Sequence, residues 1–139
     1  MKYLFDSSAI FRALKENKID LLAGNCTLEL SRYELGNIVW KEYFLQAKIS
    51  KEEAKLIVNT VKHALAIMEV LQIAGNEEEI LETAAQLKIT FYDASYAYFA
   101  KAQDLLLITE DLRLMKKLTP IIKASLLNEI EQQNGKKPY

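Results

Sequence analysis

The stretch from residue 88 to residue 112 limits the possible folds most strongly, because it joins a small-residue helix to a short apolar strand. A helix that opens at Asp93 carries alanine at every third position, which would let it lie close to a sheet. Leu105–Ile108 then reads as a buried strand, and it stops at once in Thr109–Asp111. An apolar run that ends in carboxylates is typical of a central parallel strand, whose carboxyl end faces a polar crevice.

Other short apolar stretches predict further strands, and helical patterns separate them. The further strands are expected at 3–5, 26–28 and 121–124, and the helices at 7–15, 31–47, 50–75, 76–87 and just after 111. A capping-box pattern at Ser31 and an N-cap at Ser50 mark two of the helix starts. Gly75 is expected to end the long third helix as a C-cap.

No hairpin signal connects these strands, so the sequence predicts an α/β fold. We expect a single domain over residues 1–132, with a short central parallel sheet of four or five strands covered by helices on both faces. A chain of 139 residues is long enough to bury a full core for one such domain. The C-terminal tail, residues 133–139, is expected to be frayed.

Charge and cysteine content exclude several classes of protein. The formal net charge of −1 gives no general attraction to nucleic acid or to an anionic membrane, so a polyanionic partner must be held locally. Cys26 is the only cysteine, and a buried thiol in a reducing, cytoplasmic compartment fits it. We expect neither a membrane span nor export. His63, the only histidine, is expected at the surface, which excludes histidine-based acid–base catalysis.

Four acidic residues stand at junctions that a parallel sheet would bring to one edge. They are Asp6 after the first strand, Glu34 near the start of the second helix, Asp93 before the central strand and Asp111 after it. Carboxylates that are crowded together repel, and they raise one another's pKa values unless a cation sits among them. The pattern therefore implies a divalent metal ion.

The chemistry of these ligands indicates which ion and which reaction to expect. Carboxylate oxygen is a hard ligand, so Mg²⁺ or Mn²⁺ is expected in preference to zinc. Such an ion keeps open positions for water and for a substrate phosphate. The natural reaction is metal-assisted attack of water on a phosphodiester, with one ion or with two that lie about 4 Å apart.

The segments that carry these acids resemble, in order and approximate spacing, the motifs of a known family. DSSAIFRAL at the amino end, YELGN in the second helix, TFYDASYAYFA and LLLITEDLRL resemble the four acidic motifs of the PIN-domain ribonucleases, especially the VapC toxins of toxin–antitoxin operons. The resemblance covers nearly the whole chain. It implies endonucleolytic cleavage of RNA that depends on Mg²⁺ or Mn²⁺, a homodimer, and inhibition by a small antitoxin protein.

The resemblance also implies roles for individual residues. The metal-binding quartet would be Asp6, Glu34, Asp93 and Asp111. Thr109 would be the catalytic-site hydroxyl that supports the fourth acid in the family's Thr-x-Asp motif, and Ser8 and Asn37 are further polar candidates. Glu110 adds an acid next to Asp111; we expect it to be a solvated charge at a helix start, although it leaves open which carboxylate faces the ion.

Two further groups of residues are predicted to make intermolecular contacts. The basic residues that follow the first and fourth acids are candidates for RNA phosphate contacts, and they are Arg12, Lys15, Lys18, Arg113, Lys116, Lys117 and Lys123. The helix after Glu34 is apolar on more than one stripe. Its stripe of Trp40, Tyr43 and Phe44 is either core, or part of an antitoxin groove or of the dimer contact.

Other interpretations of the same residues remain open. Each acid lies at a position where it could simply cap a helix, although capping does not explain their joint placement at one edge. Phosphatases of the haloacid dehalogenase kind and response-regulator receivers also have an aspartate after the first strand. The phosphatases need a second aspartate where this chain has Ser8, and both need a lysine in a setting that we do not find. A PIN-like module that binds RNA or protein without cutting is the stronger alternative.

Overall fold

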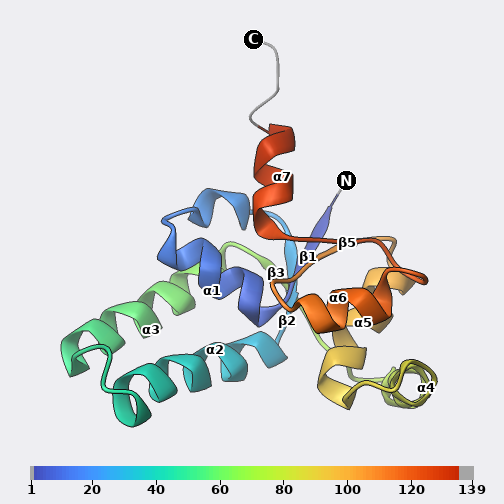
Figure 1. Cartoon of the computed structure of the whole chain (residues 1–139), viewed down its shortest axis with the longest axis horizontal. Helices are drawn as coiled ribbons and strands as arrows, with labels where there is room; N and C mark the ends of the chain where they lie inside the picture. Colours follow the sequence, from blue (N-terminus) through green and yellow to red (C-terminus); the bar gives the residue numbers. More distant parts are fainter. Residues whose placement is uncertain (1, 135–139) are drawn as a thin grey trace.

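A parallel five-stranded sheet forms the centre of the computed structural model, which describes residues 2–134 (Figure 1). The strands are β1 (Tyr3–Phe5), β2 (Cys26–Leu28), β3 (Glu69–Leu71), β4 (Leu106–Ile108) and β5 (Ala124–Ser125). They lie in the order β3-β2-β1-β4-β5, and each paired neighbour runs parallel. The predicted α/β fold with a short parallel sheet is confirmed.

The two central strands, β1 and β4, show why these short segments form a sheet. Leu4 pairs with Leu107 and Phe5 with Ile108, and all four side chains are fully buried. Successive side chains of a strand point to opposite faces, so each strand supplies apolar groups to both sides of the sheet. Leu4 and Leu107 join one hydrophobic cluster, while Phe5 and Ile108 join the other. A continuous apolar run is what a strand covered on both faces requires.

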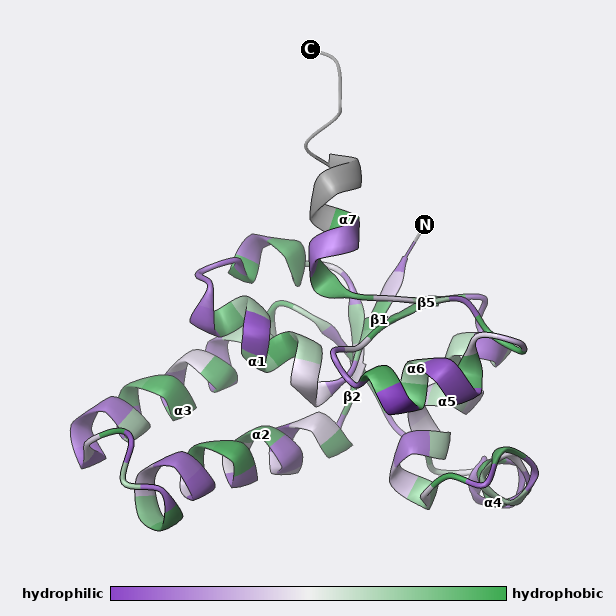
Figure 2. Ribbon diagram, viewed as in Figure 1, coloured by the Kyte–Doolittle hydropathy of each residue, from purple (hydrophilic) through white to green (hydrophobic). Residues whose placement is uncertain are grey.

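Helices cover both faces of the sheet, as the sequence predicts. One layer holds α1 (Ser7–Lys15), η1 (Ile19–Leu21), α2 (Leu30–Trp40), η2 (Lys41–Leu45), α3 (Lys51–Ala66) and α7 (Leu127–Asn134); the other holds α4 (Glu77–Leu87), α5 (Phe91–Ala102) and α6 (Leu112–Leu118). Hydrophilic and hydrophobic residues recur in turn along α3 (Figure 2), as in a helix with one face on the core. His63 of this helix is exposed, as expected, and Cys26 is a buried free thiol.

The prediction of one long helix from residue 50 to Gly75 is wrong. Ser50 caps α3 as expected, but the helix ends at Ala66 and the chain enters β3 at Glu69. Apolar residues there lie at a spacing that also suits a helix, and a strand of three residues is too short to show a period of its own. The segment pairs with β2, with Val70 opposite Thr27, and the hydrogen bonds of this pairing favour a strand over a continued helix.

The second helix also differs from its prediction at both ends. Ser31 does not cap it, because α2 begins at Leu30 and the Ser31 hydroxyl donates to the carbonyl oxygen of Leu28 at 2.8 Å. At the other end the α-helix changes at Trp40 into the π-helix η2, where a plain helix to residue 47 was expected. π-Helical turns of this kind are rare and occur frequently at functional sites.

Three smaller predictions need correction as well. Gly75, with φ of +93°, lies in the turn before α4 and ends no helix. The fifth helix begins at Phe91 and not at Asp93, because Thr90 is its N-cap. The last strand covers 124–125 in place of 121–124.

The C-terminal region is more ordered than the sequence suggests. The unpredicted helix α7 runs to Asn134, so it includes the first two residues of the expected tail, and residues 135–139 lie outside the described part of the chain. Leu127 and Ile130 of this helix are buried in the same cluster as Phe5. The core therefore continues past β5.

Candidate active site

The carboxyl ends of β1 and β4 lie next to each other where the strand order reverses. From β1 the chain moves outward to β2 and β3, and then returns to β4 on the other side of β1. A reversal of this kind leaves a crevice beyond the carboxyl ends of the strands, because the connecting helices depart on opposite faces. Asp6 directly follows β1, and Asp111 comes three residues after the end of β4.

The other two predicted acids reach the same edge from helices. Glu34 lies early in α2, which leaves the carboxyl end of β2, and Asp93 lies in the first turn of α5. α5 runs back along the sheet before entering β4, so its first turn is at the carboxyl edge. The topology thus brings segments from four parts of the chain to one side of the molecule.

Asp6 is the most deeply buried of the four acids, with 6% of its surface exposed. Its Oδ1 accepts hydrogen bonds from the Ala9 amide at 3.0 Å and from the Ser8 hydroxyl at 2.7 Å, so it also caps α1. Burial raises the pKa of Asp6 to about 6 in spite of these bonds, and the negative charge of Glu34 adds to the increase. The ionised form of Asp6 is therefore poorly compensated by the protein itself.

The four acids differ in burial, from the buried Asp6 to the exposed Asp111. Glu34 and Asp93 are half-buried, whereas Asp111 is exposed. Burial is the main cause that raises the pKa of Glu34, and the charge of Asp93 adds to it. Burial likewise raises the pKa of Asp93, together with the charge of Asp111. Each acid is thus near enough to the next for their charges to interact, in the order Asp6, Glu34, Asp93, Asp111.

Tyr96 is part of this site, although the sequence analysis did not single it out. Its hydroxyl donates a hydrogen bond to Oε1 of Glu34 at 2.7 Å, and only 2% of the residue is exposed. Tyr96 lies three residues after Asp93 on α5, so the two side chains leave the same face of the helix. That spacing is the signal in the sequence that could have identified it. The hydroxyl fixes the orientation of the Glu34 carboxylate.

Two hydroxyl groups join the first acidic segment to the fourth. Thr109 is fully buried, and its Oγ1 accepts the Asp111 amide at 3.1 Å and lies 3.4 Å from the Ser8 hydroxyl. The Ser8 Oγ in turn accepts the Glu110 amide at 3.0 Å. These bonds hold the loop between β4 and α6 against the start of α1. The position of Thr109 agrees with a supporting role for Asp111.

Glu110 does not join the other acids, and the expectation of a solvated charge at a helix start is wrong. Its side chain is only 15% exposed. Oε1 accepts from Nη1 of Arg12 at 2.5 Å, and Oε2 accepts the backbone amide of Leu127 at 3.4 Å. Asp111 instead caps α6 through Oδ1, which accepts the Leu114 amide at 3.1 Å. The adjacent acids Glu110 and Asp111 thus have different partners.

The predicted basic residues fall into two groups. Those on and after α1 lie in ion pairs, namely Lys15 with Glu42, Lys18 with Glu16, and Arg12 with both Glu16 and Glu110. Arg113 and Lys117 of α6 instead line a pocket of about 440 Å³, in which Asp93 and Asp111 form part of the wall. Lys116 and Lys123 are exposed and do not line this pocket.

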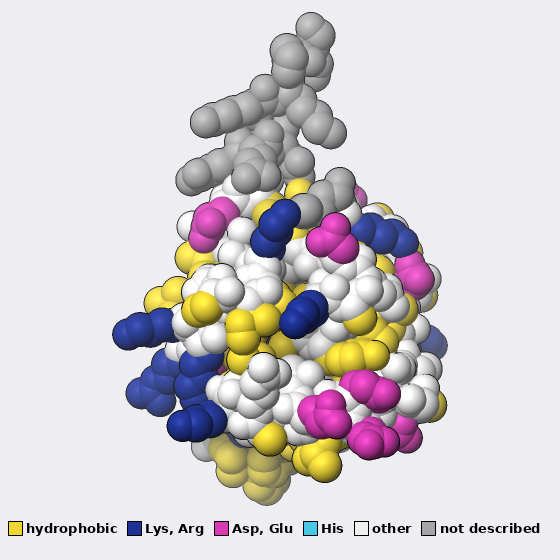
Figure 3. All heavy atoms as spheres, turned by 90° about the vertical axis from the view of Figure 1, so that its right-hand side faces the viewer, with side chains coloured by type: hydrophobic (Ala, Val, Ile, Leu, Met, Phe, Trp, Pro, Cys, Tyr) yellow, Lys and Arg dark blue, Asp and Glu magenta, His cyan; other side chains and the backbone are white. Residues whose placement is uncertain are grey.

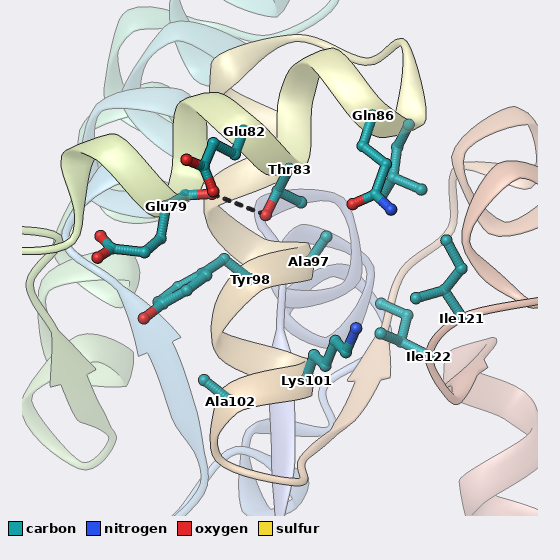
Figure 4. A pocket seen from close by; sticks show the side chains of 11 residues that line it. Glu79, Glu82, Thr83, Gln86, Ala97, Tyr98, Lys101, Ala102, Ile121 and Ile122 are labelled. Atoms are coloured by element: carbon teal, nitrogen blue, oxygen red, sulfur yellow. Dashed lines mark hydrogen bonds between the residues drawn. The ribbon is translucent and has the colours of Figure 1, made fainter.

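A second cavity, of about 430 Å³, lies between α4 and α5 (Figure 4). Tyr98 and Lys101 reach into its walls from α5, and Thr83 does so from α4, where its hydroxyl donates to the Glu79 carbonyl oxygen at 2.9 Å. None of the four predicted acids lines this cavity. It adjoins the C-terminal half of α5, whereas Asp93 lies in the first turn, so it is separate from the candidate active site.

The aromatic stripe of α2 and η2 is on the surface and not in the core. Trp40 is 46% exposed and Phe44 is 67% exposed, and their rings stack with centroids 5.8 Å apart. With Tyr43 and Val58, Trp40 lines a groove of about 410 Å³ between this segment and α3. Figure 2 shows hydrophobic residues at the far end of the segment. The choice that the sequence left open is therefore settled in favour of a surface stripe.

The donor chemistry of the four acids suits a hard divalent cation. The predicted ligands at this edge are carboxylate oxygens, and burial, together with the charge of a neighbouring acid, raises the pKa values of Asp6, Glu34 and Asp93. Within residues 2–134, no set of three acidic, histidine or cysteine side chains already has the geometry of a metal site.

A parallel sheet with acids at its carboxyl edge, in this order along the chain, is the arrangement of a PIN domain. A family model described as PIN domain matches residues 3–118, and the chain therefore belongs to this family. It is 33% identical over 129 residues to Exonuclease VapC9 of Pyrobaculum aerophilum, an alignment that covers 91% of this chain and 93% of the relative. The predicted kinship with VapC-like PIN domains is confirmed.

Solved structures agree with this assignment. The crystal structure of PAE2754 from Pyrobaculum aerophilum superposes with a TM-score of 0.82 at 27% identity, over 99% of this chain and 97% of that one. A DNA-bound VapBC structure from Salmonella typhimurium has a TM-score of 0.64 at 18% identity, over 91% and 98% of the two chains. That second likeness concerns the fold alone. No helix among the described residues has the length and apolar character to span a membrane.

Replacing Asp6 by asparagine is expected to stabilise the metal-free protein at neutral pH. The amide oxygen can still accept the bonds from Ala9 and Ser8, while the charge that burial disfavours is removed. Because the pKa of Asp6 is raised from 3.8 to about 6, its contribution to stability is full below pH 3.8 and is lost as the pH rises through 6. The loss amounts to about 3 kcal/mol at most.

Urea unfolding in EDTA at pH 4.5 and pH 7.5 measures this effect. The difference in unfolding free energy between Asp6→Asn and wild type should become more favourable to the variant at the higher pH. A difference that is the same at both pH values would show that Asp6 is not a buried, poorly compensated carboxylate.

Replacing Tyr96 by phenylalanine is expected to weaken Mn²⁺ binding by about tenfold, the lower end of what loss of an outer hydrogen bond to a ligand costs. The ring still fills its buried space, but Glu34 loses the donor that orients it. Isothermal titration calorimetry with Mn²⁺ gives the affinity directly. Tyr98→Phe is the matched control, because it removes a hydroxyl that bonds to Asn76 and not to an acid of the site. Equal affinities for the two variants would exclude a positioning role for Tyr96.

Proposed function

We propose that this protein is a metal-dependent endoribonuclease that hydrolyses RNA phosphodiester bonds, and that it is the toxin of a VapBC-type toxin–antitoxin pair. The observation that carries the proposal is the group of interacting carboxylates at the carboxyl edge of the sheet, in a chain that belongs to the PIN family. The 33% identity to a protein named Exonuclease VapC9 supports nuclease activity. Endonucleolytic action and RNA as substrate are the further steps that we propose.

The proposed ion is Mg²⁺ or Mn²⁺, present singly or as a pair. It would be held by Asp6, Glu34, Asp93 and Asp111, whose hard oxygen atoms match its preference. When bound, such an ion would supply Lewis-acid chemistry, because it would lower the pKa of a bound water molecule and polarise a phosphoryl oxygen. Asp111 is exposed, so the rim of the site is open to a phosphodiester from solvent.

The other residues of the site position these ligands. Tyr96 orients Glu34 through its hydrogen bond, and the neighbouring Ser7 hydroxyl lowers the pKa of that carboxyl group. Thr109 holds the backbone of Asp111, while Ser8 bonds at once to Asp6 and to the loop that carries Asp111. These contacts fix the orientation of the carboxylates before an ion or a substrate binds.

The exposed aromatic stripe supports a protein partner. Trp40 and Phe44 stack on each other at the edge of an apolar groove, and exposed apolar patches of this kind mark interaction sites. Structures of VapBC complexes share this fold. We propose that Trp40, Tyr43 and Phe44 contact a small antitoxin protein or a second copy of the chain in a homodimer.

We also propose a cytoplasmic location for the protein, since the buried Cys26 thiol is free.

A PIN-like module that binds without cutting is the alternative function. It is favoured by one observation, that no three carboxylates among residues 2–134 already form a metal site. The persistence of a costly group of like charges favours the enzyme, because a binding surface alone has no need for it.

RNA cleavage tests the proposed activity. Wild type with Mn²⁺ should cut a circular RNA, which has no ends, whereas an exonuclease would leave the circle intact. Asp6→Asn and Asp93→Asn should lower the rate by at least about 100-fold, because each removes a charge that holds the ion. Asp104→Asn is the matched control, since it neutralises an exposed acid in the turn before β4, away from the site.

The outcomes separate the two candidate functions. Equal cleavage by all four proteins would mean a contaminating nuclease and would remove the site assignment. RNA binding by wild type without any cleavage would establish the non-cutting module instead.

Replacing Trp40 and Phe44 together by serine is expected to weaken partner binding by at least about tenfold, because large aromatic side chains contribute most at interfaces. The fold should be unaffected, since both side chains are largely exposed. Light scattering gives self-association, and calorimetry with the protein encoded by the adjacent reading frame gives antitoxin binding. Leu81→Ser, an equally exposed apolar position on α4, is the control. Unchanged self-association and antitoxin binding would exclude this surface as the interface.

A further inference from the structure

The basic residues around the four acids differ in whether they form ion pairs with carboxylates. On the α1 side, Arg12, Lys15 and Lys18 each have a carboxylate partner within 2.9 Å. A phosphate that approached this side would have to displace those partners, and it would meet the remaining carboxylates as like charges. The α1 side is therefore less suited to an RNA backbone than a side whose cations form no ion pairs.

The opposite side of the acids has cations that form no close ion pair, although the charge of Lys117 acts on Asp93 and lowers its pKa. Lys88, Arg113 and Lys117 line the pocket of about 440 Å³ to whose wall Asp93 and Asp111 also contribute; we call it the α6 pocket. Among residues 2–134, no acidic side chain forms an ion pair with any of these three cations. Its volume lies within the range of about 300–1,000 Å³ typical of pockets for small ligands.

The walls of the α6 pocket are connected to each other. Lys88 ends α4 in the left-handed conformation, with φ of 56°. Its carbonyl oxygen accepts a hydrogen bond from Nζ of Lys117 at 3.2 Å, which ties the turn before α5 to helix α6. The same turn supplies Thr90, the N-cap of the helix that carries Asp93. The pocket and the acids are thus built on one set of elements.

Basic and acidic side chains lie on separate parts of the surface around this pocket. Helix α6 carries Arg113, Lys116 and Lys117, and Lys and Arg side chains gather at the left edge of the face in Figure 3. Acidic side chains gather at the lower right of that face, and the first turn of α4 carries Glu77, Glu78 and Glu79. A polyanion that crosses this face is therefore directed along α6 and away from α4.

We propose that the α6 pocket binds the phosphate group next to the bond that is cut, so that single-stranded RNA leaves the acids across α6 and not across α1. Unpaired cations bind backbone phosphates by releasing counterions from the nucleic acid, whereas paired cations gain little. With a net charge of −1, the protein depends on such a local group to hold a polyanion beside four acids. The inference rests on the proposed nuclease function, and it names where that site holds its substrate.

RNA binding without cleavage tests the α6 pocket. Fluorescence anisotropy with a labelled 12-nucleotide single-stranded RNA is measured in EDTA at a series of salt concentrations. The triple variant Lys88→Gln, Arg113→Gln, Lys117→Gln should bind at least about tenfold more weakly. The slope of log affinity against log salt should fall by about 2, since each lost phosphate contact on a single strand removes about 0.7.

Two further variants make this result specific. The triple variant Lys15→Gln, Lys18→Gln, Lys62→Gln has the same net charge and should bind as wild type, because its cations are paired or remote. The double variant Lys88→Gln, Arg113→Gln keeps the Lys117 bond to the Lys88 carbonyl, and a partial loss of affinity there shows that the effect is not unfolding.

The outcomes distinguish this inference from the proposed activity. Equal weakening by both triple variants, or an unchanged affinity and salt slope in the α6 variant, would overturn the assignment of the pocket. If wild type fails to cut RNA but the α6 variant alone loses binding, the nuclease proposal fails while the phosphate pocket stands.

Discussion

Repulsion among four carboxylates at one edge of the sheet is the constraint on which the rest of the site depends. The parallel topology places these groups at the carboxyl ends of β1, β2 and β4 because apolar strands must stop where the chain meets solvent. The protein offsets part of the repulsion with hydroxyl and amide donors, as at Asp6, which accepts from Ser8 and Ala9. Burial still prevails there, and the pKa of Asp6 is about 6. A proton or a bound cation would relieve this uncompensated charge.

The fold could be predicted where local pattern and tertiary pairing agree. Leu105–Ile108 is recognisable as a strand because four apolar residues end in acids, and the same holds for the short strand that precedes Asp6. β3 was missed because a three-residue strand beside a long helix shows no separate period, and its hydrogen bonds come from β2. Ser31 failed as a cap for a related reason, since its hydroxyl bonds to the Leu28 carbonyl once β2 and α2 meet.

The acids of the candidate site could be found from the sequence, but their surroundings could not. Acids at strand ends are visible as a pattern, whereas Tyr96 becomes relevant only when α5 packs near Glu34, a residue 62 positions earlier in the chain. The basic residues show the same limit. Arg12 looks available for RNA in the sequence, yet it pairs with Glu110, which lies 98 positions away. Whether a surface charge is free is a property of the tertiary structure and not of local composition.

The contact between Glu110 and the start of α7 has a mechanical consequence. The carboxylate of Glu110 accepts hydrogen bonds from Arg12 of α1 and from the backbone amide of Leu127, the first residue of α7. The residue after Glu110 is Asp111, the fourth acid of the candidate site. The C-terminal helix thus contacts the loop that carries Asp111 and helps to hold that loop in place. A molecule that displaced α7 would remove this contact and loosen the loop, and it would thereby act on the candidate site without entering it.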